Sequence, residues 1–231
     1  MKKTILNYLS PIIFVTKILD KHTKNILNEF VEQNENWLDV GCGTKPYETI
    51  FLTNGAKYTG IDVDVSGRDA SLKMPHLIFD GTNIPYPDNY FEGVICTQVL
   101  EHVIDEKKII QEIFRVLKPN GKIVISVPFC YSEHEKPYDF RRFTSFGLKY
   151  SFEKSGFVNL VLYKELSAIQ TLATLFSVYV SNNLTIPIPI LGTLVSTIIF
   201  MPINILAFFL SYVLPDKKDL FMGLIMTGNK K

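Results

Sequence analysis

Acidic and glycine residues recur in the first half of the chain at positions that suit a nucleoside ligand. Asp39 precedes a turn that contains Gly41 and Gly43, and glycines let a ligand approach the backbone closely. Asp62 and Asp80 each follow a further apolar run. A carboxylate after the second strand of an open α/β sheet can accept hydrogen bonds from both ribose hydroxyls, and one after the third can meet an adenine edge. These residue types therefore predict a nucleoside pocket.

The same turn argues against a dinucleotide. A dinucleotide-binding turn has the pattern G-x-G-x-x-G, and the helix that follows it holds a pyrophosphate at its N-terminus. The sixth position here is Pro46, which lacks an N–H and crowds the turn. A nicotinamide-dependent oxidoreductase is therefore disfavoured. A ligand with a ribose and an adenine but no phosphate, such as S-adenosylmethionine, fits better.

The elements that must position these residues are predicted from apolar runs and their spacing. Strands alternate with amphipathic helices, which is typical of an α/β fold with a mainly parallel sheet and helices on both faces. Helices are expected over residues 5–33, 105–117 and 144–154, with Thr144 as an N-cap. Strands are expected over residues 37–40, 58–62, 76–79, 91–97, 122–128, 157–163 and 220–227.

Five motifs in order resemble those of class I S-adenosylmethionine-dependent methyltransferases, in the type 11 branch whose members are often associated with surface polysaccharides. The resemblance implies a Rossmann-like, seven-stranded, mostly parallel sheet whose last strand is antiparallel. It implies S-adenosylmethionine as the cofactor. The motifs lie at residues 38–43, 60–62, 85–92, 99–103 and 115–121.

The resemblance also assigns cofactor contacts. They are Asp39, Gly41 and Gly43 for the methionine end, Asp62 for the ribose, Asp80, Gly81 and Thr82 for the adenine, and Gln98 beside the sulfonium. One position departs from the family, because Lys45 stands where a third glycine is frequent.

Three residues after the fourth and fifth predicted strands are candidates for catalysis: Glu101, His102 and His134. Methyl transfer requires an aligned acceptor and, for some acceptors, removal of a proton. Residues 98–102 also resemble the Glu-x-x-Glu-His motif with which some O-methyltransferases bind a divalent metal, and Gln98 replaces its first glutamate. The alternative, which we favour from sequence, is that Glu101 and His102 are a hydrogen-bonded pair that closes the turn.

Residues 166–215 contain no charged side chain. Their second part is longer than the ~20 residues that cross a bilayer, but their first part is marginal. Because the last strand must return to the sheet, we expect a helical hairpin that lies in or dips into the cytoplasmic face of a membrane. Lys164, Lys217 and Lys218 flank it and can meet lipid headgroups. The alternatives are a buried dimer interface or a lid over an apolar acceptor.

Composition narrows the partners and the location expected for the protein. Lys and Arg total 24 against 23 Asp and Glu, so a nucleic-acid partner is not expected. Three cysteines without a C-x-x-C pair indicate reduced thiols and a cytoplasmic protein, here at the inner face of the membrane. Three domains are expected: residues 1–35 as an N-terminal helical segment, 36–165 with 216–231 as the methyltransferase domain, and 166–215 as the apolar hairpin.

The function expected is methyl transfer from S-adenosylmethionine to a small-molecule, glycan or lipid-linked acceptor. The alternative is a membrane-associated interaction module that keeps the fold without turnover. The oligomeric state and the atom that receives the methyl group are not determined by the sequence.

Overall fold

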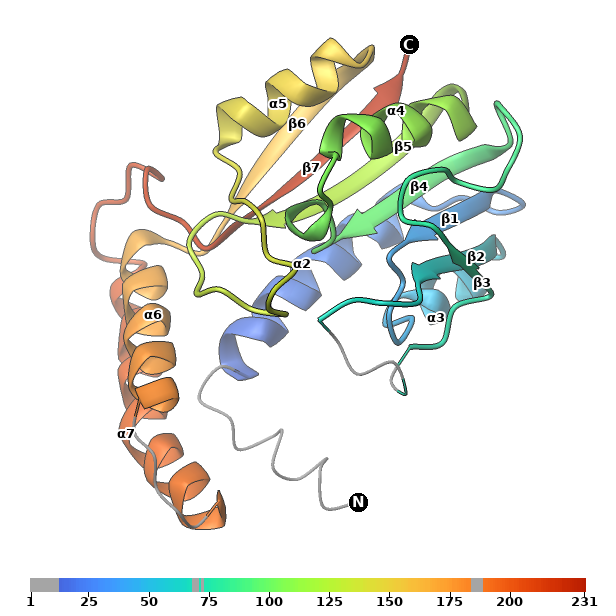
Figure 1. The fold of residues 1–231 in the computed structure, drawn as a ribbon. Helices are drawn as coiled ribbons and strands as arrows, with labels where there is room; N and C mark the ends of the chain where they lie inside the picture. The colour runs from blue at the N-terminus through green and yellow to red at the C-terminus, as the bar shows by residue number, and fades with distance from the viewer. Residues whose placement is uncertain (1–12, 68–70, 72, 184–188) are drawn as a thin grey trace. The chain divides into compact units, whose positions relative to one another are not determined.

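A computed structural model describes residues 13–67, 71, 73–183 and 189–231. Its centre is a seven-stranded sheet in the order β3-β2-β1-β4-β5-β7-β6 (Figure 1). The start of the predicted first helix, residues 5–12, lies outside the described residues. The strands are β1 (Asn36–Val40), β2 (Lys57–Val63), β3 (Leu77–Phe79), β4 (Phe91–Thr97), β5 (Leu117–Pro128), β6 (Phe157–Glu165) and β7 (Gly223–Lys230).

The strand directions confirm the predicted fold class. β1 pairs in parallel with β2 and β4, and β4 pairs in parallel with β5. β7 runs antiparallel to β5, with Met226 opposite Ile125. All the parallel strands therefore direct their carboxyl ends to one edge of the sheet, where ligands bind in folds of this kind.

Two helices cover one face of the sheet, α4 (Glu106–Val116) and α5 (Ser145–Lys154) (Figure 1). Each begins at a side-chain cap, because Asp105 accepts from Lys108 N at 3.1 Å and Thr144 accepts from Gly147 N at 3.1 Å. The Thr144 cap confirms the prediction. The apolar stripe of α4 is buried against the sheet at Ile109, Ile110 and Ile113.

The opposite face is covered by α3 (Glu48–Thr53) and the last turns of α2 (Ile13–Phe30). Phe51 lies between Trp37 and Tyr58, with ring centroids 5.4 and 5.2 Å apart. Because both faces are covered, β1 is buried from Trp37 to Val40. A rigid, buried β1 fixes the position of the turn that follows it.

The starts of two strands differ most from the prediction. β7 begins at Gly223 and not at residue 220, because its pairing with β5 starts where Gly223 lies opposite Pro128. β5 begins at Leu117, directly after α4, because Leu117 pairs with Phe91 before an irregularity shifts the register to Lys122 opposite Gly93.

The chain divides into two compact units. One contains the sheet and comprises residues 24–129, 133–163 and 223–231; the other comprises residues 1–23, 130–132 and 164–222. Within the second unit the uncharged residues form two helices, α6 (Ala168–Asn183) and α7 (Pro189–Leu210).

The two helices of this hairpin pack together through apolar and polar contacts. Phe176 and Phe200 meet at a ring-centroid distance of 6.0 Å, and buried Asn204 donates to Ser177 Oγ at 3.1 Å. Ser167 and Gln170 form a reciprocal cap at the start of α6. Among the described residues, none of the helices combines the length and the apolar character needed to cross a membrane.

Candidate active site

The turn after β1 is tied directly to the end of β2. The N–H groups of Gly41 and Cys42 donate to the carbonyl of Ile61 at 2.8 and 3.0 Å, and Gly43 N donates to Asp62 Oδ2 at 2.8 Å. Gly41 has φ +74°, and a Cβ there would lie 2.3 Å from Val99 Cγ2. Only glycine therefore fits the first position of this turn.

Asp62 is held with its carboxylate at the carboxyl edge of the sheet. Oδ1 accepts from Val63 N at 2.7 Å, and the Lys73 ammonium lies 3.7 Å from the same oxygen. A carboxylate has about four acceptor positions, so each oxygen keeps capacity for one more donor. This arrangement suits two ribose hydroxyls.

Asp39 is buried behind the glycine turn. Tyr58 donates to its Oδ2 at 2.6 Å, while Oδ1 has no hydrogen-bond partner among the described residues. Burial raises the pKa of Asp39 to about 7, although the Tyr58 hydrogen bond opposes the shift. A buried oxygen without a partner at this position fits the ammonium of a methionine end.

A cavity of about 440 Å³ opens at this edge of the sheet. That volume is typical of small-ligand sites. The structure brings seven predicted residues into its wall, namely Gly41, Asp62, Asp80, Gly81, Thr82, Gln98 and His102. Four others, Asp39, Gly43, Glu101 and His134, are not in the wall.

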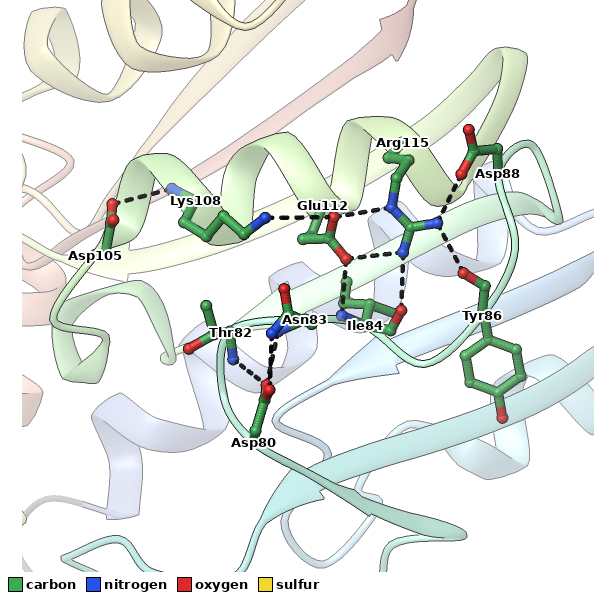
Figure 2. A network of polar contacts seen from close by, with 10 residues as sticks. All are labelled: Asp80, Thr82, Asn83, Ile84, Tyr86, Asp88, Asp105, Lys108, Glu112 and Arg115. Carbon is green, nitrogen blue, oxygen red and sulfur yellow. Dashed lines mark hydrogen bonds and ion pairs between the residues drawn. The ribbon is translucent and has the colours of Figure 1, made fainter.

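The loop after β3 is shaped by Asp80 (Figure 2). Its Oδ1 accepts from the backbone N–H groups of Thr82 and Asn83 at 2.7 Å each, and Oδ2 accepts from Asn83 Nδ2 at 2.8 Å. These hydrogen bonds, the one from Asn83 N first, lower the pKa of Asp80. Asp80 thereby holds Gly81 and Thr82 in the cavity wall.

Arg115 clamps the next part of this loop to α4 (Figure 2). Its guanidinium donates at 2.8 Å to the carbonyls of Ile84 and Tyr86 and to the carboxylates of Asp88 and Glu112. Glu112 also accepts from Ile84 N at 2.9 Å. The clamp connects two predicted motifs, residues 85–92 and 115–121, and explains why they occur together.

The residue directly after β4, Gln98, has a left-handed backbone conformation. Gln98 has φ +54°, its N–H donates to Ser126 O at 2.8 Å, and its amide Nε2 donates to Ser126 Oγ at 3.2 Å. A non-glycine residue in this conformation is strained, and such strain is concentrated at functional sites.

The three catalytic candidates lie close together, but Glu101 and His102 do not form the hydrogen bond that we favoured from sequence. Glu101 Oε1 and His102 Nε2 are 3.9 Å apart, which is too long for a hydrogen bond. His102 Nδ1 is instead 2.8 Å from the carbonyl oxygen of Tyr138. The expectation of a Glu101–His102 hydrogen bond was therefore wrong, because the loop after β5 supplies the histidine's partner.

His134 joins these two residues from that loop. Its ring centroid lies 4.8 Å from that of His102, and its Nδ1 lies 3.3 Å from Asp139 Oδ2. Arg142 donates to both oxygens of Asp139 at 2.5 and 2.6 Å, which lowers the pKa of that carboxyl. One ligand atom from each of Glu101, His102 and His134 lies within 4.8 Å of the others.

Several residues of the site were missed by sequence reasoning. Lys73, Glu135 and Tyr138 line the cavity, and Asp139 orients His134. They lie in loops without a strand-end pattern, so spacing contained no signal for them. The only hint was the dense polar run around His134.

The Arg115 clamp predicts a large effect on stability. Arg115→Met leaves buried Glu112 and two loop carbonyls without their donor, and such losses cost about 2–4 kcal/mol. Urea denaturation measures the change. Lys108→Met is the control, since Lys108 lies 4.0 Å from the same Glu112 but is more exposed; its cost is about 0–1 kcal/mol. Equal midpoints for the two variants would contradict the clamp.

Asp39 predicts a pH dependence of stability. Its pKa rises from 3.8 to about 7 in the folded chain, so ionisation disfavours the native state as pH rises through that window. A pKa shift of one unit corresponds to about 1.36 kcal/mol of unfolding free energy. At pH 8, Asp39→Asn should therefore be more stable to unfolding than the wild type by up to about 4 kcal/mol, whereas at pH 4 this effect contributes nothing. Urea titrations at both pH values measure it; a gain that does not vary with pH argues against this origin.

Comparison with known proteins agrees with this geometry. A profile of the family described as "Methyltransferase domain" matches residues 38–125. A ubiquinone biosynthesis O-methyltransferase of Idiomarina loihiensis is 31% identical over 121 residues, which cover 47% of this chain and 46% of that protein. A demethylmenaquinone methyltransferase of Staphylococcus epidermidis is 34% identical over 119 residues, covering 47% and 48%.

Solved structures with a similar fold include a methyltransferase. The structure of phosphoethanolamine N-methyltransferase 2 from Haemonchus contortus, in complex with S-adenosyl-L-methionine, superposes with a TM-score of 0.59 at 16% identity and covers 91% of this chain and 52% of that one. The chain spans about half the length, or less, of the curated relatives that it matches. With the motifs, the strand order and the strand-end residues in agreement, the chain carries a class I S-adenosylmethionine-dependent methyltransferase domain.

Proposed function

We propose that the chain transfers a methyl group from S-adenosylmethionine to an ionisable hydroxyl of a small or lipid-linked acceptor at the inner face of a membrane. The observation that carries the proposal is the cavity at the carboxyl edge of the sheet. Its wall contains Gly41 of the glycine turn, Asp62 and His102. Cofactor groups and an acid–base group therefore face one space.

The residue types in and behind the cavity wall suit S-adenosylmethionine. Asp62 would hold the ribose, the loop that Asp80 shapes would meet the adenine, and Asp39 would face the methionine ammonium. When bound, the cofactor supplies an activated methyl group. The chain's own part is to align the acceptor with it and to exclude water.

The acceptor end is inferred from the wall near His102. Val103, Ile104, Tyr138 and Phe140 line it together with Glu135. An apolar and aromatic wall with a few polar groups suits an aromatic or enolic hydroxyl better than a densely polar sugar, although a glycan remains the alternative. The quinone-pathway names of two relatives are consistent with this preference.

A membrane location is supported by the surface of the hairpin. The described part of α6, α7 and the segment after them exposes large apolar side chains without an intervening charge, and an apolar surface of this kind marks an interaction site. Lys164, Lys217 and Lys218 flank it, as headgroup contacts would require. The exposed side chains are Leu172, Phe176, Tyr179, Ile198, Leu206, Phe209, Tyr212 and Val213.

The cofactor assignment predicts that Asp62→Ala binds S-adenosylmethionine more than tenfold more weakly. Two hydrogen bonds to a charged group are worth about 1.5–3 kcal/mol each. Isothermal titration measures the affinity, and circular dichroism checks that the variant is folded. Asp64→Ala, two residues on and outside the cavity wall, is the matched control. Unchanged affinity in Asp62→Ala would remove the assignment, whereas cofactor binding without transfer to any acceptor favours the interaction module.

The hairpin predicts lipid binding. The full chain should sediment with anionic vesicles and resist high-salt extraction, because burial of apolar surface is worth about 25 cal/mol per Å². Phe209→Lys with Leu206→Lys should reduce sedimentation, whereas Phe146→Lys, at a still more exposed aromatic on α5, should not. Replacement of residues 167–214 by a short polar loop should retain cofactor binding. Recovery of the intact chain as a detergent-free monomer that ignores vesicles would refute the location.

A further inference from the structure

We propose that Lys73 is a further cofactor-binding residue, whose ammonium donates a hydrogen bond to a ribose hydroxyl that Asp62 also holds. Lys73 lines the cavity together with Asp62, and its Nζ lies 3.7 Å from Asp62 Oδ1. A hydrogen-bond donor and an acceptor therefore lie next to each other in the cavity wall. This role deepens the proposed function and rests on its cofactor assignment.

The charge of Lys73 is buried beside that of Asp62. The Lys73 side chain is 5% exposed and the Asp62 side chain 9%. A lysine is rarely buried to this extent unless it is paired, because removal of an ammonium from water is costly. At 3.7 Å the two charges attract each other but form no hydrogen bond. Asp62 thus balances the charge of Lys73, while the N–H groups need other acceptors.

The protein uses only part of the donor capacity of this ammonium, which has three N–H groups. Lys73 Nζ donates to Val63 O at 2.7 Å and to Asp64 O at 3.4 Å, and the second of these hydrogen bonds is long. Among the described residues, no further hydrogen bond of this ammonium is found. At least one N–H is therefore available to a ligand in the cavity.

A ribose hydroxyl suits this pair of groups, since it is a donor and an acceptor at once. It can donate to the Asp62 carboxylate, which keeps acceptor positions beside its bonds from Gly43 N and Val63 N. Its oxygen can then accept from Lys73. A hydroxyl bound in this way satisfies both charged groups, whereas a deoxyribose leaves the ammonium short of an acceptor.

The same ammonium also braces the loop after β2. Its bonds to the carbonyls of Val63 and Asp64 hold the chain that leads to Val65 and Ser66, which line the cavity as well. Loss of a loop brace weakens every ligand of the site alike. Loss of a hydrogen bond to one hydroxyl weakens only the ligands that carry this hydroxyl. The two effects are therefore separated by comparing ribose with deoxyribose ligands.

Isothermal titration of the full chain with S-adenosylhomocysteine and with its 2′-deoxy and 3′-deoxy analogues tests the contact. Lys73→Met should bind S-adenosylhomocysteine about tenfold more weakly or worse, because a hydrogen bond to a charged group is lost. For the analogue that lacks the contacted hydroxyl, the loss should shrink to about twofold, the part due to the loop. Lys57→Met, at an exposed lysine that begins the same strand, is the matched control and should change no affinity.

A second variant covers the case in which Lys73→Met does not fold, as judged by circular dichroism. Lys73→Gln keeps an N–H donor without the charge, so its loss of affinity should be smaller but specific to the same hydroxyl. Equal losses for all three ligands, or no loss for any, overturn the ribose contact and leave the cofactor assignment intact.

Two results separate this contact from the proposed function. A wild type that binds none of the three ligands refutes the cofactor assignment, and the role of Lys73 falls with it. The expected pattern of affinities in a protein that transfers no methyl group keeps the role of Lys73 and refutes the proposed function.

Discussion

The cofactor cavity depends on one junction between two strands. The carbonyl of Ile61 accepts from both Gly41 and Cys42, and Asp62 accepts from Gly43, so the turn after β1 is fastened to the end of β2. The junction forms because β1 and β2 are parallel and end at the same edge of the sheet. The same hydrogen bonds hold Asp62 in the cavity wall, and the backbone is left open to a ligand.

Two buried carboxylates are costly to the stability of the fold. Asp39 and Glu101 lie after or near the ends of adjacent strands, and each has oxygen without a partner among the described residues. Burial raises the pKa of Asp39 to about 7 and that of Glu101 to about 8. By contrast, Asp80 and Glu112 are fully engaged and shape a loop. The acidic residues of this fold thus divide into those whose oxygens are hydrogen-bonded and those with an oxygen that has no partner among the described residues.

Charged side chains are also distributed unevenly along the chain. The sheet unit carries ion pairs around the cavity, such as Arg142 with Asp139. Residues 166–215 of the other unit contain no charged side chain; α6 and α7 of this range pack together, and some of their polar side chains, such as Asn204, bond within the hairpin. Internal satisfaction of polar groups is what an apolar environment demands. The ion pairs around the cavity and the uncharged hairpin therefore lie in separate units of the chain.

The sequence by itself determined most of the helices and strands and the strand ends that line the cavity. The spacing of apolar residues and the positions of turn residues located the strands, the cap at Thr144 and the uncharged hairpin. These features depend on neighbouring residues along the chain. Gly41, Asp62 and Asp80 were placed at the cavity for the same reason, since each lies at or directly after the end of a strand. Boundaries such as the start of β7 were missed by a few residues, because pairing with β5 decides them.

Only the tertiary structure decided the acceptor half. Glu101 and His102 were expected to bond to each other, but the loop after β5 brings Tyr138 to His102 and Asp139 to His134. These partners lie more than thirty positions from Glu101 or in a loop without periodicity, so no local pattern indicates them. Which side chains converge there, and which buried oxygens remain without a donor, depends on how two strand ends and one loop pack in space.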